Sequence, residues 1–113
     1  MRPHVRIGVA GWALGKAVKG LFPEEGTHLA RYAQVFNAVE INSTFYRMPR
    51  AGTLERWAAS TPPDFRFAVK MPKAITHERR LAGAGRELMH FLEALEALGE
   101  RCGPVLVQLP PSL

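Results

Sequence analysis

The chain has 113 residues, of which 47% are hydrophobic and 22% charged, and its formal net charge is +5 with an isoelectric point of about 10.0. This composition is typical of one globular domain over residues 1–113 and argues against intrinsic disorder. No run approaches the ~18 apolar residues that span a membrane, and glycines interrupt the apolar N-terminus where a signal peptide would continue, so we expect a cytoplasmic protein.

Strand-like apolar runs alternate with helical stretches along the chain. The expected strands cover residues 4–12, 38–46, 65–72 and 103–113, and the expected helices cover residues 27–36, 51–61 and 86–100. Thr27 and Thr53 are the expected N-caps of the first two helices, because a threonine hydroxyl accepts a hydrogen bond from a free N–H group of the first turn. A polar, basic loop over residues 73–85 follows the third strand. The single cysteine, Cys102, excludes an internal disulfide and a cysteine-based zinc cluster, and we expect a half-buried thiol at the last helix–strand junction.

This alternation predicts an α/β fold with the order β-α-β-α-β-α-β. Strands separated by helices pair in parallel through right-handed crossovers. A TIM-barrel-like arrangement satisfies this order, and an open doubly wound sheet is the alternative. No Gly-x-Gly-x-x-Gly fingerprint follows the first strand, so the sequence gives no support for a dinucleotide site.

The expected strands share one distribution of side chains, because successive residues of a strand point to opposite faces. One face is apolar and suited to packing under helices: Ile7, Val9, Val39, Ile41, Phe65, Phe67, Val69, Met71, Val105, Val107 and Leu109. The other face carries polar residues near the carboxyl ends of the strands: Glu40, Asn42, Lys70 and Gln108. These residues are expected to converge where parallel α/β folds place their sites. The alternative is a Glu40–Lys70 salt bridge that only fixes the strand register.

Four stretches of the chain resemble one known family: "GVAGWALG", "VEINSTFYRMP", "FRFAVKMPKAITHERRL" and "GPVLVQLPPSL". In this order they are similar to the YecE-like family, known as domain of unknown function 72. The resemblance implies a TIM barrel but no defined reaction. Family members are about twice as long as this chain, in line with the roughly 250 residues of a typical barrel. The chain therefore resembles the N-terminal half of such a barrel, with the first four parallel strands.

The candidate catalytic residues are Glu40, Lys70 and His77. Glu40 is a possible general base or a ligand to a hard metal ion. Lys70 can hold an anionic group, and His77 is the histidine placed for acid–base work. The candidate substrate-binding residues are Trp12, Asn42, Tyr46, Arg47, Arg79 and Gln108. Each also has a structural explanation, such as core packing for Trp12 or a solvated loop charge for Arg47.

These residue types suggest an enzyme that acts on a small anionic or polyhydroxylated substrate, of phosphoester or sugar type. One alternative is a nucleic-acid-binding module, with its contacts in the basic "HERR" stretch over residues 77–80. Another alternative is an inactive fragment. No nucleotide-cofactor motif occurs, and a divalent metal bound through Glu40 stays open. The partners we expect are a small anionic molecule and either a second copy of the chain or a missing C-terminal half, since half a barrel leaves strand edges unpaired.

Overall fold

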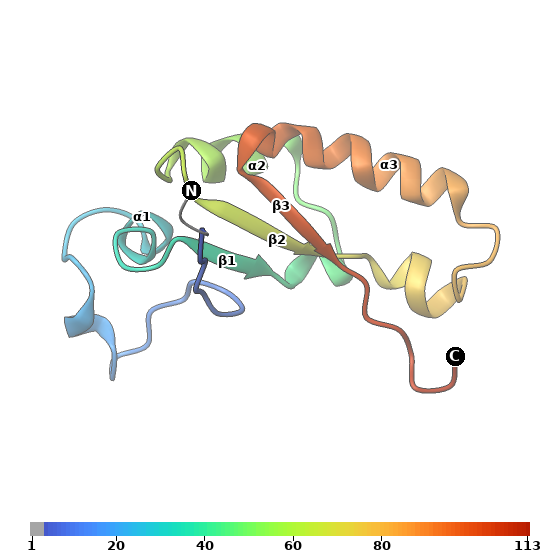
Figure 1. The fold of residues 1–113 in the computed structure, drawn as a ribbon, viewed down its shortest axis with the longest axis horizontal. Coiled ribbons are helices and arrows are strands. Elements are labelled where there is room, and N and C mark those ends of the chain that lie inside the picture. Colours follow the sequence, from blue (N-terminus) through green and yellow to red (C-terminus); the bar gives the residue numbers. More distant parts are fainter. Residues whose placement is uncertain (1–3) are drawn as a thin grey trace.

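A parallel sheet lies at the centre of the molecule (Figure 1). The computed structural model describes residues 4–113, and within them three strands pair in the order β1-β2-β3. The strands are β1 (Ala38–Ile41), β2 (Arg66–Lys70) and β3 (Cys102–Leu106), and the α-helices are α1 (His28–Tyr32), α2 (Ala51–Ala59) and α3 (Gly85–Leu95). Shorter helical turns are η1 (Lys19–Leu21), η2 (Ser43–Phe45), η3 (Ala74–Glu78) and η4 (Glu96–Arg101). The predicted α/β class with parallel strands is confirmed.

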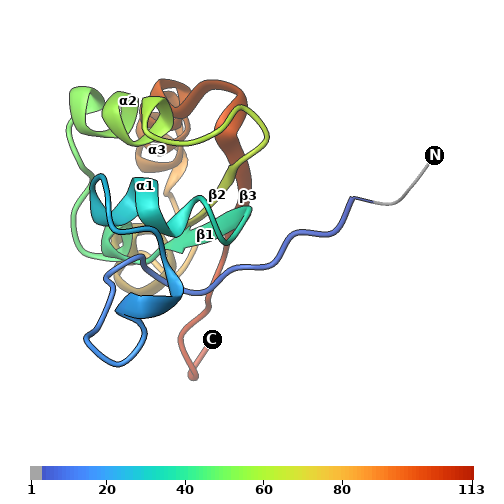
Figure 2. The ribbon, with the colours of Figure 1, turned by 90° about the vertical axis from the view of Figure 1, so that its left-hand side faces the viewer.

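The helices cover one face of the sheet and bury its apolar side chains (Figure 2). The predicted apolar face of the third expected strand is confirmed, because its four members are each at most 9% exposed: Phe65, Phe67, Val69 and Met71. Leu54 of α2 and Phe91 of α3 belong to the same core. Burial of a side chain of this size contributes about 1.5–3 kcal/mol. The core therefore fixes which face of β2 is left for polar residues.

The opposite face of the sheet carries Glu40, Ala68 and Lys70, all half-buried. Among residues 4–113, no helix lies over this face (Figure 2). Val39 pairs with Phe67 and Ile41 pairs with Val69, so the ends of β1 and β2 are level. Asn42 and Lys70 each follow directly after this last pair. The register therefore brings the carboxyl ends of the two strands side by side, as the sequence predicts.

The first expected strand, residues 4–12, is wrong as a continuous strand, because only Ala10 pairs with the sheet, opposite Glu40. The Glu40 N–H group donates to the Val9 carbonyl at 3.1 Å, and the Gly11 N–H group donates to the Glu40 carbonyl at 3.0 Å. Ile7 and Val9, which were expected under the helices, are 64% and 56% exposed.

Two side chains replace the strand pairing before Ala10. The Val9 N–H group donates to the Tyr32 hydroxyl at 2.9 Å, and this hydroxyl donates to the Ala38 carbonyl at 2.7 Å. Asn37 acts in the same way, because its Oδ1 accepts from the Ile7 N–H group at 2.8 Å. Backbone groups need a partner, but a side chain can supply it as well as a strand can. The segment is therefore attached to β1 through side chains.

The helix starts agree with the sequence in one case and differ in the other. The Thr27 hydroxyl accepts from the Ala30 N–H group at 3.1 Å, so Thr27 is the N-cap of α1 as predicted. Helix α2 has Arg50 as its N-cap, so the expected cap Thr53 is wrong. Thr53 lies one turn inside the helix, where its hydroxyl accepts from Arg56 Nη2 at 3.3 Å.

The C-terminal third of the chain departs from the expectation in three places. The loop expected over residues 73–85 contains the π-helical turn η3, which buries Ile75 and Thr76. The helix expected over residues 86–100 divides into α3 and η4. Strand β3 ends at Leu106, so Val107 and Leu109 leave the helix-covered face and are 45% and 47% exposed.

Cys102 begins β3 directly after η4 and is half-buried, as predicted. Burial raises the pKa of its thiol above the ordinary value. None of the helices in the described part of the chain is both long and apolar enough to cross a membrane. The assignment of residues 1–113 to one domain stays a prediction.

Candidate functional site

A crevice of about 340 Å³ lies at the carboxyl end of β1. It is lined by Ala10, Gly11, Trp12, Ala13, Glu40, Ile41, Asn42, Ser43 and Trp57. Gly11 has a φ of +80°, a backbone conformation that favours glycine and turns the chain from Ala10 toward Trp12. The structure thus brings together three residues that the sequence singled out: Trp12, Glu40 and Asn42.

Two indole rings form the apolar wall of the crevice. Trp12 and Trp57 meet edge to face, with ring centroids 4.7 Å apart and an interplanar angle of 79°. Trp12 also contacts Phe67 of the core at 6.2 Å between centroids, so it both packs on the core and lines the crevice. Trp57 was not among the predicted site residues, because the periodicity of the expected helix over residues 51–61 places it with Leu54 and Ala58 in an apolar stripe. One signal could have identified it: an indole ring is large enough to pack on the core and still reach the surface beside the helix.

Glu40, Asn42 and Ser43 supply the polar groups of the crevice. The backbone of Glu40 is bonded to the first segment through its N–H and carbonyl groups. Its side chain is half-buried, and within residues 4–113 it forms no ion pair and no side-chain hydrogen bond. The alternative of a Glu40–Lys70 salt bridge is therefore wrong. The Glu40 carboxylate stays available to a ligand, because Lys70 is directed toward a different partner.

That partner is Phe45 of η2. Lys70 Nζ lies 4.4 Å from the centroid of the Phe45 ring, a cation–π contact. The buried Thr44 holds η2 against β2, because its hydroxyl donates to the Lys70 carbonyl at 2.6 Å. His77 packs edge to face on the same Phe45 ring with centroids 4.9 Å apart, and its Nδ1 lies 2.7 Å from Thr76 Oγ1. Lys70 and His77 therefore meet around Phe45 and not around Glu40.

Tyr46 and Arg47 extend the same region into solvent. The Tyr46 ring contacts Phe45 at 5.0 Å between centroids and is 75% exposed. Lys73 Nζ lies 5.7 Å from the Tyr46 centroid. Arg47 is exposed. The residues after β1 and β2 thus form a second, cationic region beside the crevice.

Two candidates lie elsewhere. Arg79 pairs with Glu87 of α3 at 2.9 Å between Nη2 and Oε1, so its charge serves a contact between η3 and α3. Gln108 is exposed and follows the end of β3, and it does not line the crevice. In residues 4–113, no three histidine, cysteine, aspartate or glutamate side chains gather as a metal site would require. The roles of Arg79 and Gln108, like those of the other candidate residues, stay predictions.

Comparison with known proteins places the chain in a family. The family described as "Protein of unknown function DUF72" matches residues 6–113. The UPF0759 protein YecE of Escherichia coli K12 is 36% identical over 107 residues, which cover 94% of this chain and 38% of that protein. The UPF0759 protein YunF of Bacillus subtilis 168 is 29% identical over 76 residues, which cover 67% of this chain and 27% of that protein.

Two solved structures have the same fold. A DUF72 family protein from Enterococcus faecalis V583 aligns with a TM-score of 0.72 at 27% identity, covering 93% of this chain and 39% of that one. A DUF72 family protein from Thermotoga maritima MSB8 aligns with a TM-score of 0.69 at 30% identity, covering 93% and 44%. The chain thus spans about two fifths of the length of these relatives, which are more than twice as long. It belongs to the DUF72 family, as a partial TIM-barrel-like α/β domain.

Proposed function

We propose that the crevice at the end of β1 binds a small polyhydroxylated ligand, and that Glu40 is the acid–base group of an enzyme acting on it. One observation carries the proposal: two indole rings line the same crevice as a carboxylate that has no ion-pair partner among residues 4–113. Binding pockets typically combine an apolar wall with a few polar groups that orient the ligand. The C–H face of a sugar-like ring packs on such an aromatic wall.

The polar groups of the crevice are of the kinds that form hydrogen bonds with hydroxyl groups. The Glu40 carboxylate accepts hydrogen bonds, whereas the Asn42 amide and Ser43 hydroxyl both donate and accept them. The Glu40 carboxylate is the charged group of the crevice lining, so the crevice itself favours a neutral, hydroxyl-bearing part of a ligand over an anionic one. A carboxylate within about 2.6–3.2 Å of a hydroxyl is placed to remove its proton.

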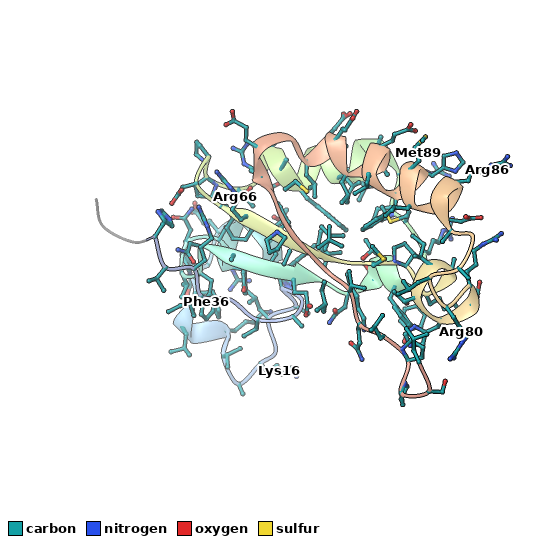
Figure 3. All side chains as sticks on the ribbon, turned by 45° about the vertical axis from the view of Figure 1, so that its right-hand side comes forward. Lys16, Phe36, Arg66, Arg80, Arg86 and Met89 are labelled. Carbon is teal, nitrogen blue, oxygen red and sulfur yellow. The ribbon has the colours of Figure 1, made fainter. Side chains whose placement is uncertain are left out.

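The arginines of the "HERR" stretch do not favour the nucleic-acid alternative. Arg79 is paired with Glu87. Arg80, labelled in Figure 3, donates to Ser112 through Nη1 and Nη2, each at 2.8 Å. Both guanidinium groups therefore have partners within the chain.

Intrinsic fluorescence tests the proposal directly, because the chain has two tryptophans and both line the crevice. Neutral monosaccharides and polyols are titrated into the chain while the emission is recorded. We expect a saturable change for at least one compound, weakened at least tenfold by Glu40→Gln. Glu55→Gln, an exposed change on α2, is the matched control and leaves the response unchanged. The proposal is overturned if none of the compounds gives a saturable response, or if the Glu40→Gln and Glu55→Gln variants respond equally.

A further inference from the structure

Three side chains that carry or can accept positive charge surround two adjoining aromatic rings beside the crevice. This cationic cluster consists of Lys70, Lys73 and His77 around Phe45 and Tyr46. Lys70 Nζ lies 4.4 Å from the Phe45 centroid, and Lys73 Nζ lies 5.7 Å from that of Tyr46. His77 contacts the Phe45 ring at 4.9 Å. The rings hold the two ammonium groups and the imidazole in one region of the surface.

The cationic cluster has no ion-pair partner in the part of the chain that the structure describes. Within residues 4–113, Lys70, Lys73 and His77 form no ion pair, whereas His4, Arg6 and Arg79 each have a carboxylate partner. Cation–π contact orients an ammonium group but leaves its positive charge in place. Like charges held near one another repel, and an anion bound between them offsets this repulsion. The cluster therefore has the charge and the free donors of an anion site.

The cluster and the crevice are joined by one short element. Turn η2 begins with Ser43, which lines the crevice, and ends with Phe45, which lies under Lys70. Between them, the buried Thr44 ties η2 to both strands through the Ile41 and Lys70 carbonyls. Asn42 and Lys70 lie at the level ends of two strands, and neighbouring strands are about 4.8 Å apart. A single small ligand can therefore reach both regions.

We infer that the ligand of this site is a phosphorylated polyhydroxylated compound. Its hydroxyl-bearing body occupies the crevice between the indole rings and Glu40, and its phosphate is bound by Lys70 and Lys73, with His77 as a further donor. Lysine is a compact point charge with three donors, suited to a phosphate. This inference rests on the proposed function, and it assigns the phosphate to a separate place from the carboxylate that would repel it.

The test compares matched pairs of a neutral sugar or polyol and its phosphate monoester by tryptophan fluorescence. We expect the phosphorylated member of at least one pair to bind at least tenfold more tightly. This gain falls as salt is added, because ions screen exposed charges. Lys70→Met and Lys73→Met each reduce the gain, which is measured for each variant as the ratio of its affinities for the phosphorylated and the neutral member. Lys16→Met, at an exposed position that is labelled in Figure 3 and is not part of the cluster, keeps the full gain.

The outcomes separate the two proposals. If neutral compounds bind but their phosphates bind no more tightly, the inference is overturned and the proposed function stands. If neither type changes the emission, the proposed function fails and the inference with it. If a sugar acid gains as much as the phosphate ester, the assignment to phosphate is overturned. Should Lys70→Met not fold, as circular dichroism would show, Lys73→Met decides, because Lys73 lies outside the strand.

Discussion

At the scale of single residues, Tyr32 shows how one hydroxyl determines the attachment of a whole segment. Its ring is almost fully buried, and its hydroxyl both accepts from Val9 and donates to Ala38. The donated hydrogen bond requires the protonated phenol. Burial raises the pKa of Tyr32 above the ordinary 10.0, although the hydrogen bond from the Val9 N–H group acts in the opposite direction.

This raised pKa predicts a loss of stability in alkali. A group whose pKa is higher in the folded than in the unfolded chain contributes its full stability below the unfolded value, here about 10, and loses it as the pH rises through the folded value. In a Tyr46→Phe variant, Tyr32 is the remaining tyrosine, and its absorbance at 295 nm should titrate at higher pH in the folded chain than in urea. The free energy of unfolding should fall above pH ~10. Identical midpoints with and without urea would contradict this.

The residue scale also shows what could be predicted about the site. Glu40 and Asn42 were identified from alternation along a strand, and Trp12 from its place at the end of the first expected strand. The structure places all three at the crevice. Trp57 was not identified as a site residue. Helical periodicity distinguishes a buried stripe from an exposed face, but it does not show which residues lie at the border between the two. The separation of Lys70 from Glu40 was also unpredictable, because it depends on Phe45, a residue with no polar group to draw attention to it.

At the scale of elements, the first segment differs most from its sequence pattern. Its alternation of Val5, Ile7 and Val9 is typical of a strand, yet pairing is limited to Ala10. At Gly8 this segment lies so close to β1 that a side chain has no room: a Cβ atom there would lie 1.9 Å from the Ala38 carbonyl oxygen and 3.0 Å from the Tyr32 hydroxyl. A side chain at this position would therefore displace the segment from the sheet.

We accordingly predict that Gly8→Ala destabilises the chain by about 1–3 kcal/mol, the usual cost of an inserted group that forces the backbone to move. Denaturant unfolding measures this change, and hydrogen exchange at the Gly11 and Glu40 amides should become faster, since both are bonded across this contact. Gly15→Ala is the matched control, because no atom lies within 4 Å of its added Cβ. Equal stability of the two variants would show that the approach of Gly8 to β1 is not needed.

At the scale of the whole molecule, the sheet is covered on one side and open on the other. Apolar side chains are exposed along the first segment, at the last residue of β3 and beyond it: Val5, Ile7, Val9, Leu106, Val107 and Leu109. On α3, Figure 3 shows Met89 and Arg86 directed outward, away from the sheet. Exposed apolar groups beside unpaired strand edges favour association with another chain.

We therefore predict that the chain associates with itself when it is studied alone. Size-exclusion chromatography with light scattering should give a mass above the 12.5 kDa of one chain, rising with concentration. Val107→Lys with Leu109→Lys should lower this mass, because lysines beside a strand edge oppose pairing. A 12.5 kDa species that melts cooperatively at every concentration would contradict the prediction.

The sequence by itself determined the α/β class, the parallel order of the strands and the faces of β2, because these follow from local periodicity. Only the tertiary structure decided whether the first segment pairs with β1, because the Tyr32 and Asn37 side chains compete for the same backbone groups. It also divided the polar residues into a crevice around Glu40 and a cluster around Phe45. Such a division depends on which side chains meet in space, and alternation along a strand gives their faces but not their partners.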